Sequence, residues 1–228
     1  MRVHVAFTPE EAASAHVGIV VDVLRATSTI AQALASGYER VYCAAEIDEA
    51  RALREKLGEG LLGGERNAVQ IDGFDVGASP REFVGEPRAR TVIFSTTNGT
   101  RAILQAAALC EEVLLGSLLN LEAVAAAARE RGQDVEILCA GFQGQFALDD
   151  AYCAGRIVQL LDGEPTDSSK AADAIARAWP DAHEGLLART YGPPGLEEDI
   201  AFCAQVSVLD VVPRLNRMLD GAAEITAG

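Results

Sequence analysis

Thr91-Val-Ile-Phe-Ser-Thr-Thr-Asn-Gly-Thr-Arg101 is the stretch that decides the fold. Its apolar run predicts a buried strand, and a helical pattern begins at Ala102, so the polar residues between them form a loop at a helix N-terminus. Free backbone N–H groups and the helix dipole make such a junction favourable for anions. An ordinary helix cap is the alternative, because Ser, Thr and Asn are the usual capping residues. The candidate anion-binding residues are Ser95, Thr96, Thr97, Asn98, Gly99, Thr100 and Arg101.

A second stretch upstream has the same pattern. Gly18–Asp22 predicts a strand that ends in an acid, and a helix follows over residues 30–36, so that Thr29 corresponds to Thr100. Extending the comparison gives two similar β-loop-α-β-α-β halves, over approximately residues 17–90 and 91–161. We therefore expect a single domain over residues 1–228, in which residues 162–228 form a C-terminal helical extension.

Alternating strands and helices predict an α/β fold, a three-layer α/β/α arrangement with a largely parallel or mixed sheet. Ligands of such sheets bind beyond the carboxyl ends of the strands. That rule predicts that four loops meet at one rim of the sheet, over residues 22–29, 64–67, 95–101 and 141–146. The long, turn-rich connection over residues 64–90 is expected to be an ordered active-site loop.

Composition limits the classes of function. The net charge of −15 argues against nucleic-acid binding through a broad basic face. No apolar run reaches the roughly 18 residues of a membrane span, and no secretory signal is apparent. The five cysteines are widely spaced without a CxxC pair, which favours free thiols in a reducing cytoplasm and disfavours a zinc site. The Ala-rich helix expected at residues 119–131 could pack against a second copy in a homo-oligomer or against the sheet.

The loop after the first strand offers Asp22, Arg25, Thr27 and Ser28. An acid at the end of a strand, facing a crevice, suits Mg²⁺, which takes one or two carboxylates and leaves its other positions to water and phosphate oxygens. The alternative for Asp22 is a cap of the turn. Arg25 could clamp an anion through two parallel hydrogen bonds, or could pair with Asp22.

Three further groups of polar residues follow later strands. Glu65 and Arg66 come after a Gly-Gly turn, where a plain surface turn is the alternative. Gln143 lies in an otherwise apolar loop and could orient a substrate carboxylate or a water. Asp149 and Asp150 are candidates for a second acid or a metal ligand, although helix-dipole stabilisation alone would explain one of them.

Several familiar catalytic motifs are absent from the sequence. It contains no G-x-x-x-x-G-K-[ST] phosphate loop and no G-x-S-x-G nucleophile elbow. Residues 58–63 fit G-x-G-x-x-G formally, but they precede a predicted strand instead of following one. The sequence therefore shows anion donors and acids without a nucleophile of a known type.

Taken together, these segments resemble the 2-phosphosulfolactate phosphatase family. The matching stretches lie in order between about residues 18 and 160, and the C-terminal third matches only loosely. They are Val20-Val-Asp-Val-Leu-Arg-Ala-Thr-Ser-Thr29, Gly64-Glu-Arg66, Gly73-Phe-Asp75, Ser79-Pro80, Ser95-Thr-Thr-Asn-Gly-Thr-Arg101, Cys139-Ala-Gly141 and Asp149-Asp-Ala-Tyr-Cys-Ala-Gly155.

The resemblance implies Mg²⁺-dependent hydrolysis of the phosphomonoester of a small sulfonated carboxylic acid, within coenzyme M synthesis. Its partner is then a small anionic phosphorylated substrate. The expected catalytic residues are Asp22, Glu65 and Asp149, and the expected metal ligands are Asp22, Glu65 and Asp150. Substrate and phosphate would be bound by Arg25, Thr27, Ser28, Arg66, Ser95, Thr96, Thr97, Asn98, Gly99, Thr100, Arg101 and Gln143. Three alternatives stay open: a phosphatase for another phosphorylated hydroxy acid, a non-catalytic binder or sensor of such acids, and a transferase or lyase.

Overall fold

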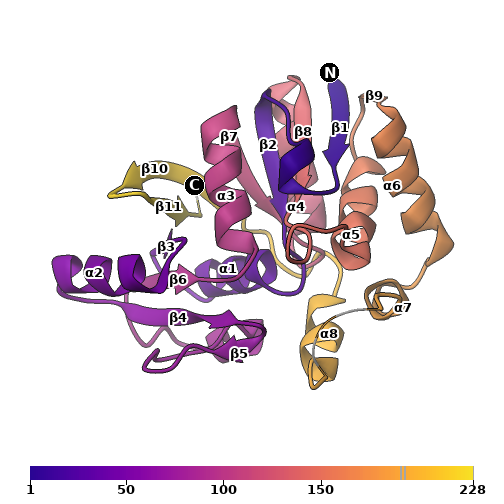
Figure 1. Cartoon of the computed structure of the whole chain (residues 1–228). Helices are drawn as coiled ribbons and strands as arrows, with labels where there is room; N and C mark the ends of the chain where they lie inside the picture. Colours follow the sequence, from indigo (N-terminus) through magenta and orange to yellow (C-terminus); the bar gives the residue numbers. More distant parts are fainter. Residues whose placement is uncertain (191, 193, 228) are drawn as a thin grey trace.

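The computed structural model describes residues 1–190, 192 and 194–227. Within them 11 strands form one sheet, in the order β5-β4-β6-β3-β11-β10-β7-β2-β8-β1-β9 (Figure 1). The strands are β1 (Arg2–Ala6), β2 (Ala15–Val21), β3 (Arg40–Cys43), β4 (Leu61–Arg66), β5 (Val69–Gln70), β6 (Thr91–Ser95), β7 (Cys110–Gly116), β8 (Val135–Cys139), β9 (Glu164–Pro165), β10 (Arg214–Leu219) and β11 (Ala222–Thr226).

Helices follow most of these strands. They are α1 (Ala26–Ala35), α2 (Ile47–Leu57), α3 (Gly99–Leu109), α4 (Leu121–Arg131), α5 (Leu148–Val158), α6 (Asp167–Ala178), α7 (Ala182–Leu187) and α8 (Glu197–Cys203), with short 3-10 turns η1 (Pro9–Glu11) and η2 (Pro80–Phe83). α2 shows why such boundaries are predictable. A capping box between Glu46 and Glu49 begins it, and Gly58 ends it in the left-handed conformation that glycine adopts without strain.

The sheet consists of two parallel blocks joined by a hairpin. In the first block β6 lies between β3 and β4, and in the second β2 lies between β7 and β8, all parallel. The β10–β11 hairpin pairs antiparallel with β3 on one side and with β7 on the other. These three antiparallel steps make the two blocks run in opposite directions. The sheet is therefore mixed, and the first strand of each predicted half is inserted into the other half.

Alternate residues of β2 show the three layers. Ile19 and Val21 belong to a core with residues of α4 and α5, whereas Val20 belongs to a second core with residues of α1 and α3. Successive strand residues point to opposite faces, so helices cover both faces of the sheet. The predicted α/β/α class is confirmed. The origin of the two halves by duplication stays a prediction.

The alanines of α4 settle one of the open alternatives. Ala125, Ala127 and Ala128 are buried in the core that also contains Ile19 and Ile137 of the sheet. The Ala-rich face therefore packs against the sheet within the chain, and a homo-oligomer stays a prediction without this support. In the described part of the chain, no helix combines the length and the apolar character that crossing a membrane requires.

The prediction of a helical C-terminal extension is wrong for residues 214–226. They form β10 and β11 at the centre of the sheet, and Ala222–Ile225 are buried. The strand pattern is hard to read because it contains the charged Glu224, which is buried. Tyr42 donates a 2.8 Å hydrogen bond to this carboxylate and Arg217 a 2.9 Å one, so the charge is satisfied inside the fold.

Candidate active site

The four predicted loops meet around one cavity of about 280 Å³. It is lined by residues that follow β2, β4, β6 and β8, and by parts of the segment between α7 and α8. The four loops come together as predicted, but they do not lie along one rim of the sheet. The two blocks run in opposite directions, and residues that follow strands of both blocks line the cavity, so it lies between the carboxyl ends of opposed strands.

Two glycines allow this close approach. A Cβ at Gly99, where α3 begins, would lie 2.4 Å from the Cβ of Ala26 and 2.5 Å from Oδ2 of Asp22. A Cβ at Gly64, whose φ is +146°, would lie 2.0 Å from the carbonyl oxygen of Ser95. Gly99 does not itself line the cavity. The structure therefore gives it a spacing role, not the direct contact with an anion that was predicted.

Four carboxylates line the cavity: Asp22, Glu65, Asp149 and Asp150. All three aspartates are buried. Burial is the largest cause that raises the pKa of Asp22 to about 7, and the nearby negative charges of Glu65 and Asp149 raise it further against the lowering effect of a hydrogen bond from the N–H of Ala26. Burial, followed by the charge of Asp149, likewise holds the pKa of Asp150 well above its usual range.

Asp150 and Glu65 also connect loops to one another. The Asp150 carboxylate accepts a hydrogen bond from the N–H of Val23 at 2.9 Å and another from the N–H of Gly141 at 3.0 Å. Glu65 accepts one from the N–H of Thr97 at 2.7 Å. Each acid thus ties together two loops that come from different strands. Their positions are fixed by backbone groups, which prepares the walls of the cavity for a ligand.

Several predicted hydroxyls lie beneath the cavity instead of lining it. Thr27, Ser28, Ser95 and Thr100 are fully buried, with no more than traces of exposed surface. Their hydroxyls donate to backbone carbonyls: Thr27 to Asp22 at 2.9 Å, Ser28 to Val23 at 2.8 Å, Thr100 to Thr96 at 3.0 Å and Ser95 to Ala45 at 3.3 Å. The predicted contact of these residues with phosphate is therefore replaced by support of their own loops, because a buried hydroxyl requires a nearby partner. Of the second loop, Thr96, Thr97 and Asn98 do line the cavity, as does Gln143.

The loops after β2 and β6 share one pattern of internal hydrogen bonds. The hydroxyl of Thr27 bonds both the N–H and the carbonyl of Asp22, and that of Thr100 bonds both groups of Thr96. Thr27, not Thr29, is therefore the counterpart of Thr100. The strand-end acid of one loop corresponds to the hydroxyl of Thr96 in the other.

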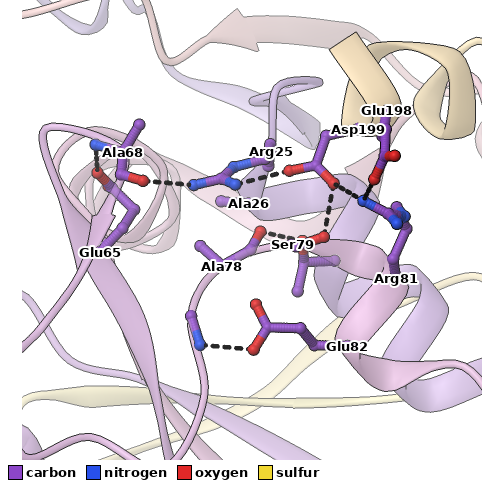
Figure 2. A network of polar contacts seen from close by, with 12 residues as sticks. Arg25, Ala26, Glu65, Ala68, Ala78, Ser79, Arg81, Glu82, Glu198 and Asp199 are labelled. Carbon is purple, nitrogen blue, oxygen red and sulfur yellow. Dashed lines mark hydrogen bonds and ion pairs between the residues drawn. The ribbon is translucent and has the colours of Figure 1, made fainter. Parts of the chain in front are cut away.

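Arg25 lines the cavity and is held by a buried ion pair. Its Nη1 lies 2.6 Å from Oδ2 of Asp199, and its Nη2 donates to the carbonyl of Ala68 at 3.3 Å (Figure 2). Both side chains of the pair are less than 10% exposed, at 9% and 7%. Asp199 also accepts a 2.6 Å hydrogen bond from the hydroxyl of Ser79. The partner of Arg25 in this ion pair is thus Asp199, where the sequence suggested Asp22.

The other two predicted arginines lie outside the cavity lining. Arg66 donates from Nη2 to the hydroxyl of Ser95 at 2.9 Å and to the carbonyl of Ala45 at 3.0 Å. Arg101 is exposed and forms a 2.8 Å ion pair with Glu46. Arg66 therefore braces the ends of β4 and β6, and the predicted role of Arg101 in anion binding has no support from its position.

Two charged residues of the site were not predicted. Arg189 lines the cavity, and Asp199 pairs with Arg25 at its edge. Both belong to the C-terminal third of the chain, where the sequence shows no strand-end pattern. Asp199 lies in the acidic run Glu197-Glu-Asp199 at the start of α8, where the helix dipole alone accounts for acids. No signal in the sequence separated either residue from ordinary surface charge.

A closed metal cage is not preformed in this cavity. Among the residues that the structure describes, no group of three or more His, Cys, Asp or Glu side chains is placed to hold a metal ion. Mg²⁺ requires less, since one or two carboxylates suffice when water and phosphate oxygens complete its shell. Asp22, beside other carboxylates whose charges disfavour its ionised form, provides such a donor set.

Comparison with known proteins identifies the family. The sequence model described as 2-phosphosulpholactate phosphatase matches residues 4–218 of the chain. The chain belongs to this family. Similar relatives, each named probable 2-phosphosulfolactate phosphatase, occur in Caldanaerobacter subterraneus subsp. tengcongensis (41% identical, 87% of each chain covered), Thermus thermophilus (41%, 95% of each) and Carboxydothermus hydrogenoformans (38%, 93% of this chain and 92% of the relative).

The match to the 2-phosphosulfolactate phosphatase family extends beyond the segments that first suggested it. Residues 4–218 include the segment after α7, which contains Arg189, and the start of α8, which contains Asp199. The family resemblance inferred from the sequence is confirmed over almost the whole chain. The cavity described above is the place in this chain where its predicted strand-end acids come together.

Proposed function

We propose that the chain is a phosphatase that hydrolyses the phosphomonoester of a small hydroxy acid carrying a carboxylate or a sulfonate, with 2-phosphosulfolactate as the first candidate. The observation that carries the proposal is the cavity itself, where Asp22, Asp149 and Arg25 face one space together with the start of α3. Acids for a cation, a guanidinium for an anion and a helix N-terminus are the groups that phosphoryl transfer uses. Membership of the family supports the same reaction.

We propose that Mg²⁺ is held by Asp22 together with one neighbouring carboxylate, Glu65 or Asp150. Relief of the repulsion among these buried acids supports a cation at this place. When bound, the ion would stabilise charge on the phosphoryl oxygens and lower the pKa of a coordinated water. Asp150 and Glu65 keep the loops in position through the backbone hydrogen bonds described above.

The chain's own residues have distinct roles in the proposed reaction. Thr96 and Asn98, in the loop that leads into α3, face the cavity where the helix dipole favours the transferring phosphoryl group. Asp149 faces the same space, and we propose that it accepts the proton of the attacking water. Arg25, fixed by Asp199, lines the cavity, and we propose that its remaining N–H groups bind the substrate. As the P–O ester bond breaks, the proton held by Asp149 passes to the leaving alkoxide oxygen, so the products are the free hydroxy acid and phosphate.

The direct experiment measures free phosphate released from a panel of phosphomonoesters, with Mg²⁺ and after its removal by a chelator. We expect release from esters of small acids, above all 2-phosphosulfolactate, and loss of release without the metal. Tight binding without turnover of any ester would instead indicate a binder or sensor. Transfer of the phosphoryl group to an added acceptor in place of water would indicate a transferase.

We also propose that the protein acts in the cytoplasm and supplies sulfolactate for coenzyme M synthesis. All five cysteines are free thiols, which agrees with a reducing compartment. Cell fractionation tests the location. Accumulation of 2-phosphosulfolactate in cells that lack the protein tests the pathway, and unchanged levels would contradict it.

A further inference from the structure

Among the described residues, one arginine of the cavity forms no salt bridge with a carboxylate. Arg25 and Arg189 both line the cavity, beside the four carboxylates. Arg25 is paired with Asp199 at 2.6 Å, and that buried pair is neutral as a unit. Among the residues that the structure describes, no carboxylate lies within the 4.0 Å of a salt bridge from Arg189. Of the described arginines at the cavity, Arg189 thus offers the uncompensated positive charge.

The fold fixes the place of Arg189 relative to the carboxylates. It follows α7, in which Leu186 is fully buried and Gly185 packs on the ring of Tyr152 in α5. A Cβ at Gly185 would lie 2.5 Å from ring carbons of Tyr152, so the two helices are in close contact at this point. Since α5 also carries Asp149 near its start, the helix that precedes Arg189 packs on the helix that carries this acid.

The helix that follows Arg189 in the chain, α8, is anchored as well. Asp199 of α8 holds Arg25 and the hydroxyl of Ser79, and the neighbouring Glu198 pairs with Arg81 (Figure 2). The helices before and after Arg189 in the chain, α7 and α8, are therefore both attached to the rest of the domain. Arg189 lines the ligand space and forms no salt bridge with a described carboxylate, so a bound anion would supply its counter-charge.

We propose that Arg189 recognises the carboxylate or sulfonate of the substrate, the anionic group that is not the transferred phosphoryl group. The inference rests on the proposed phosphatase function and adds the residue that selects acidic esters. The phosphoryl group belongs beside the carboxylates and the start of α3, where a cation and the helix dipole can act on it. A second anionic group then needs its own counter-charge in a chain of net charge −15, and a guanidinium binds carboxylate or sulfonate oxygens through two parallel N–H donors.

The test compares two substrates in the variants Arg189→Ala and Arg189→Lys. The measured quantity is kcat/KM for 2-phosphosulfolactate divided by kcat/KM for isopropyl phosphate, which has no acid group. We expect Arg189→Ala to lower this ratio by about 10- to 100-fold, mainly through KM, because a charge-assisted hydrogen bond contributes that much selectivity. Arg189→Lys should restore part of the ratio. Arg129→Ala, which removes an exposed arginine at the end of α4, is the matched control and should leave the ratio unchanged.

An unchanged ratio in a folded Arg189→Ala variant would overturn the proposal, as would an equal loss for both esters. Calorimetric binding of unphosphorylated sulfolactate separates this result from a failure of the phosphatase function. If wild-type protein hydrolyses no ester but binds sulfolactate about tenfold more tightly than Arg189→Ala, the function fails and the recognition role stands. If wild type and variant bind sulfolactate equally, or neither binds it, the recognition role is wrong.

Discussion

Asp22 is a residue whose chemistry is decided by its place at the end of β2. Burial, with the charges of Glu65 and Asp149, raises its pKa to about 7 from 3.8. Between these two pH values the folded chain holds a proton that the unfolded chain has already released. The free energy of unfolding therefore falls as pH rises from about 4 to about 7. Above pH 7, burying the ionised Asp22 carboxylate destabilises the fold by its full amount.

Asp22→Asn removes this cost because the amide stays neutral and its oxygen can still accept the N–H of Ala26. At pH 8.5 without metal we expect the variant to be more stable by about 2 to 4 kcal/mol, a rise in Tm of roughly 5 to 10 °C. At pH 5 the difference should become small. Thermal unfolding followed by circular dichroism measures both, with the exposed Asp162→Asn as a control that changes neither. A variant less stable than wild type at pH 8.5 would contradict the raised pKa.

At this scale the sequence predicted acids better than hydroxyls. An acid directly after a buried strand, as at Asp22, can lie only where the strand ends, so its place follows from the strand. A hydroxyl such as that of Ser28 has two equally good partners, a ligand or the nearest carbonyl, and residue type does not distinguish them. Arg189 was missed because its position depends on the packing of α7 on α5, which no local pattern shows.

At the scale of elements, Asp150 links the loop after β2 to the loop after β8. Its two carboxylate oxygens accept the N–H groups of Val23 and Gly141 inside the protein. Asp150→Ala leaves both buried donors without a partner, and we expect a loss of about 3 kcal/mol, or more, in the free energy of unfolding. Asp150→Asn keeps one acceptor oxygen and should lose about 1 kcal/mol. Urea unfolding midpoints at pH 7 provide the comparison.

The decisive result is which of these two variants loses more stability. Equal stability of Asp150→Ala and Asp150→Asn would show that the backbone hydrogen bonds do not hold the loops together. A matched control is Asp167→Ala, which removes an acid from the first turn of α6 where the side chain is fully exposed. It should cost less than about 1 kcal/mol.

Element prediction was accurate where periodicity is strong and local. The helix α2 carries both of its end signals in the sequence, a capping box of Glu46 and Glu49 at its start and the left-handed Gly58 at its end. The loop predicted at 64–67 is instead the end of β4, which continues to Arg66 and turns back as β5. That two-residue strand is too short to leave a pattern in the sequence.

For the whole molecule, the β10–β11 hairpin joins the two opposed blocks of the sheet through its pairing with β7 and β3. Ile225, close to the end of the described chain, is fully buried in the core that contains α1 and α3. Ile225→Ala should therefore destabilise the entire domain by about 2 to 4 kcal/mol. Met218→Ala in β10 is the matched control, because its side chain is 47% exposed and should cost less than about 1 kcal/mol. Similar small losses in both variants, measured by urea unfolding, would argue that the hairpin is peripheral.

The class of the fold could be predicted at this scale, but the arrangement could not. Alternating strands and helices required an α/β/α sandwich. Which strands become neighbours is decided by pairing between distant segments, such as β6 between β3 and β4, and the sequence carries no local record of it. Because β2 lies between β7 and β8, and β6 between β3 and β4, loops from both halves of the chain meet at one cavity.

The central claim is that this cavity hydrolyses a phosphomonoester of a small acid with the help of Asp22. The most direct measurement is the steady-state rate of phosphate release from 2-phosphosulfolactate with saturating Mg²⁺, for wild type and for folded Asp22→Asn. We predict turnover by wild type and a loss of at least about 100-fold in kcat for the variant. Full activity of Asp22→Asn with the same Mg²⁺ dependence, or no phosphate release by wild type from any acidic ester, would contradict the account.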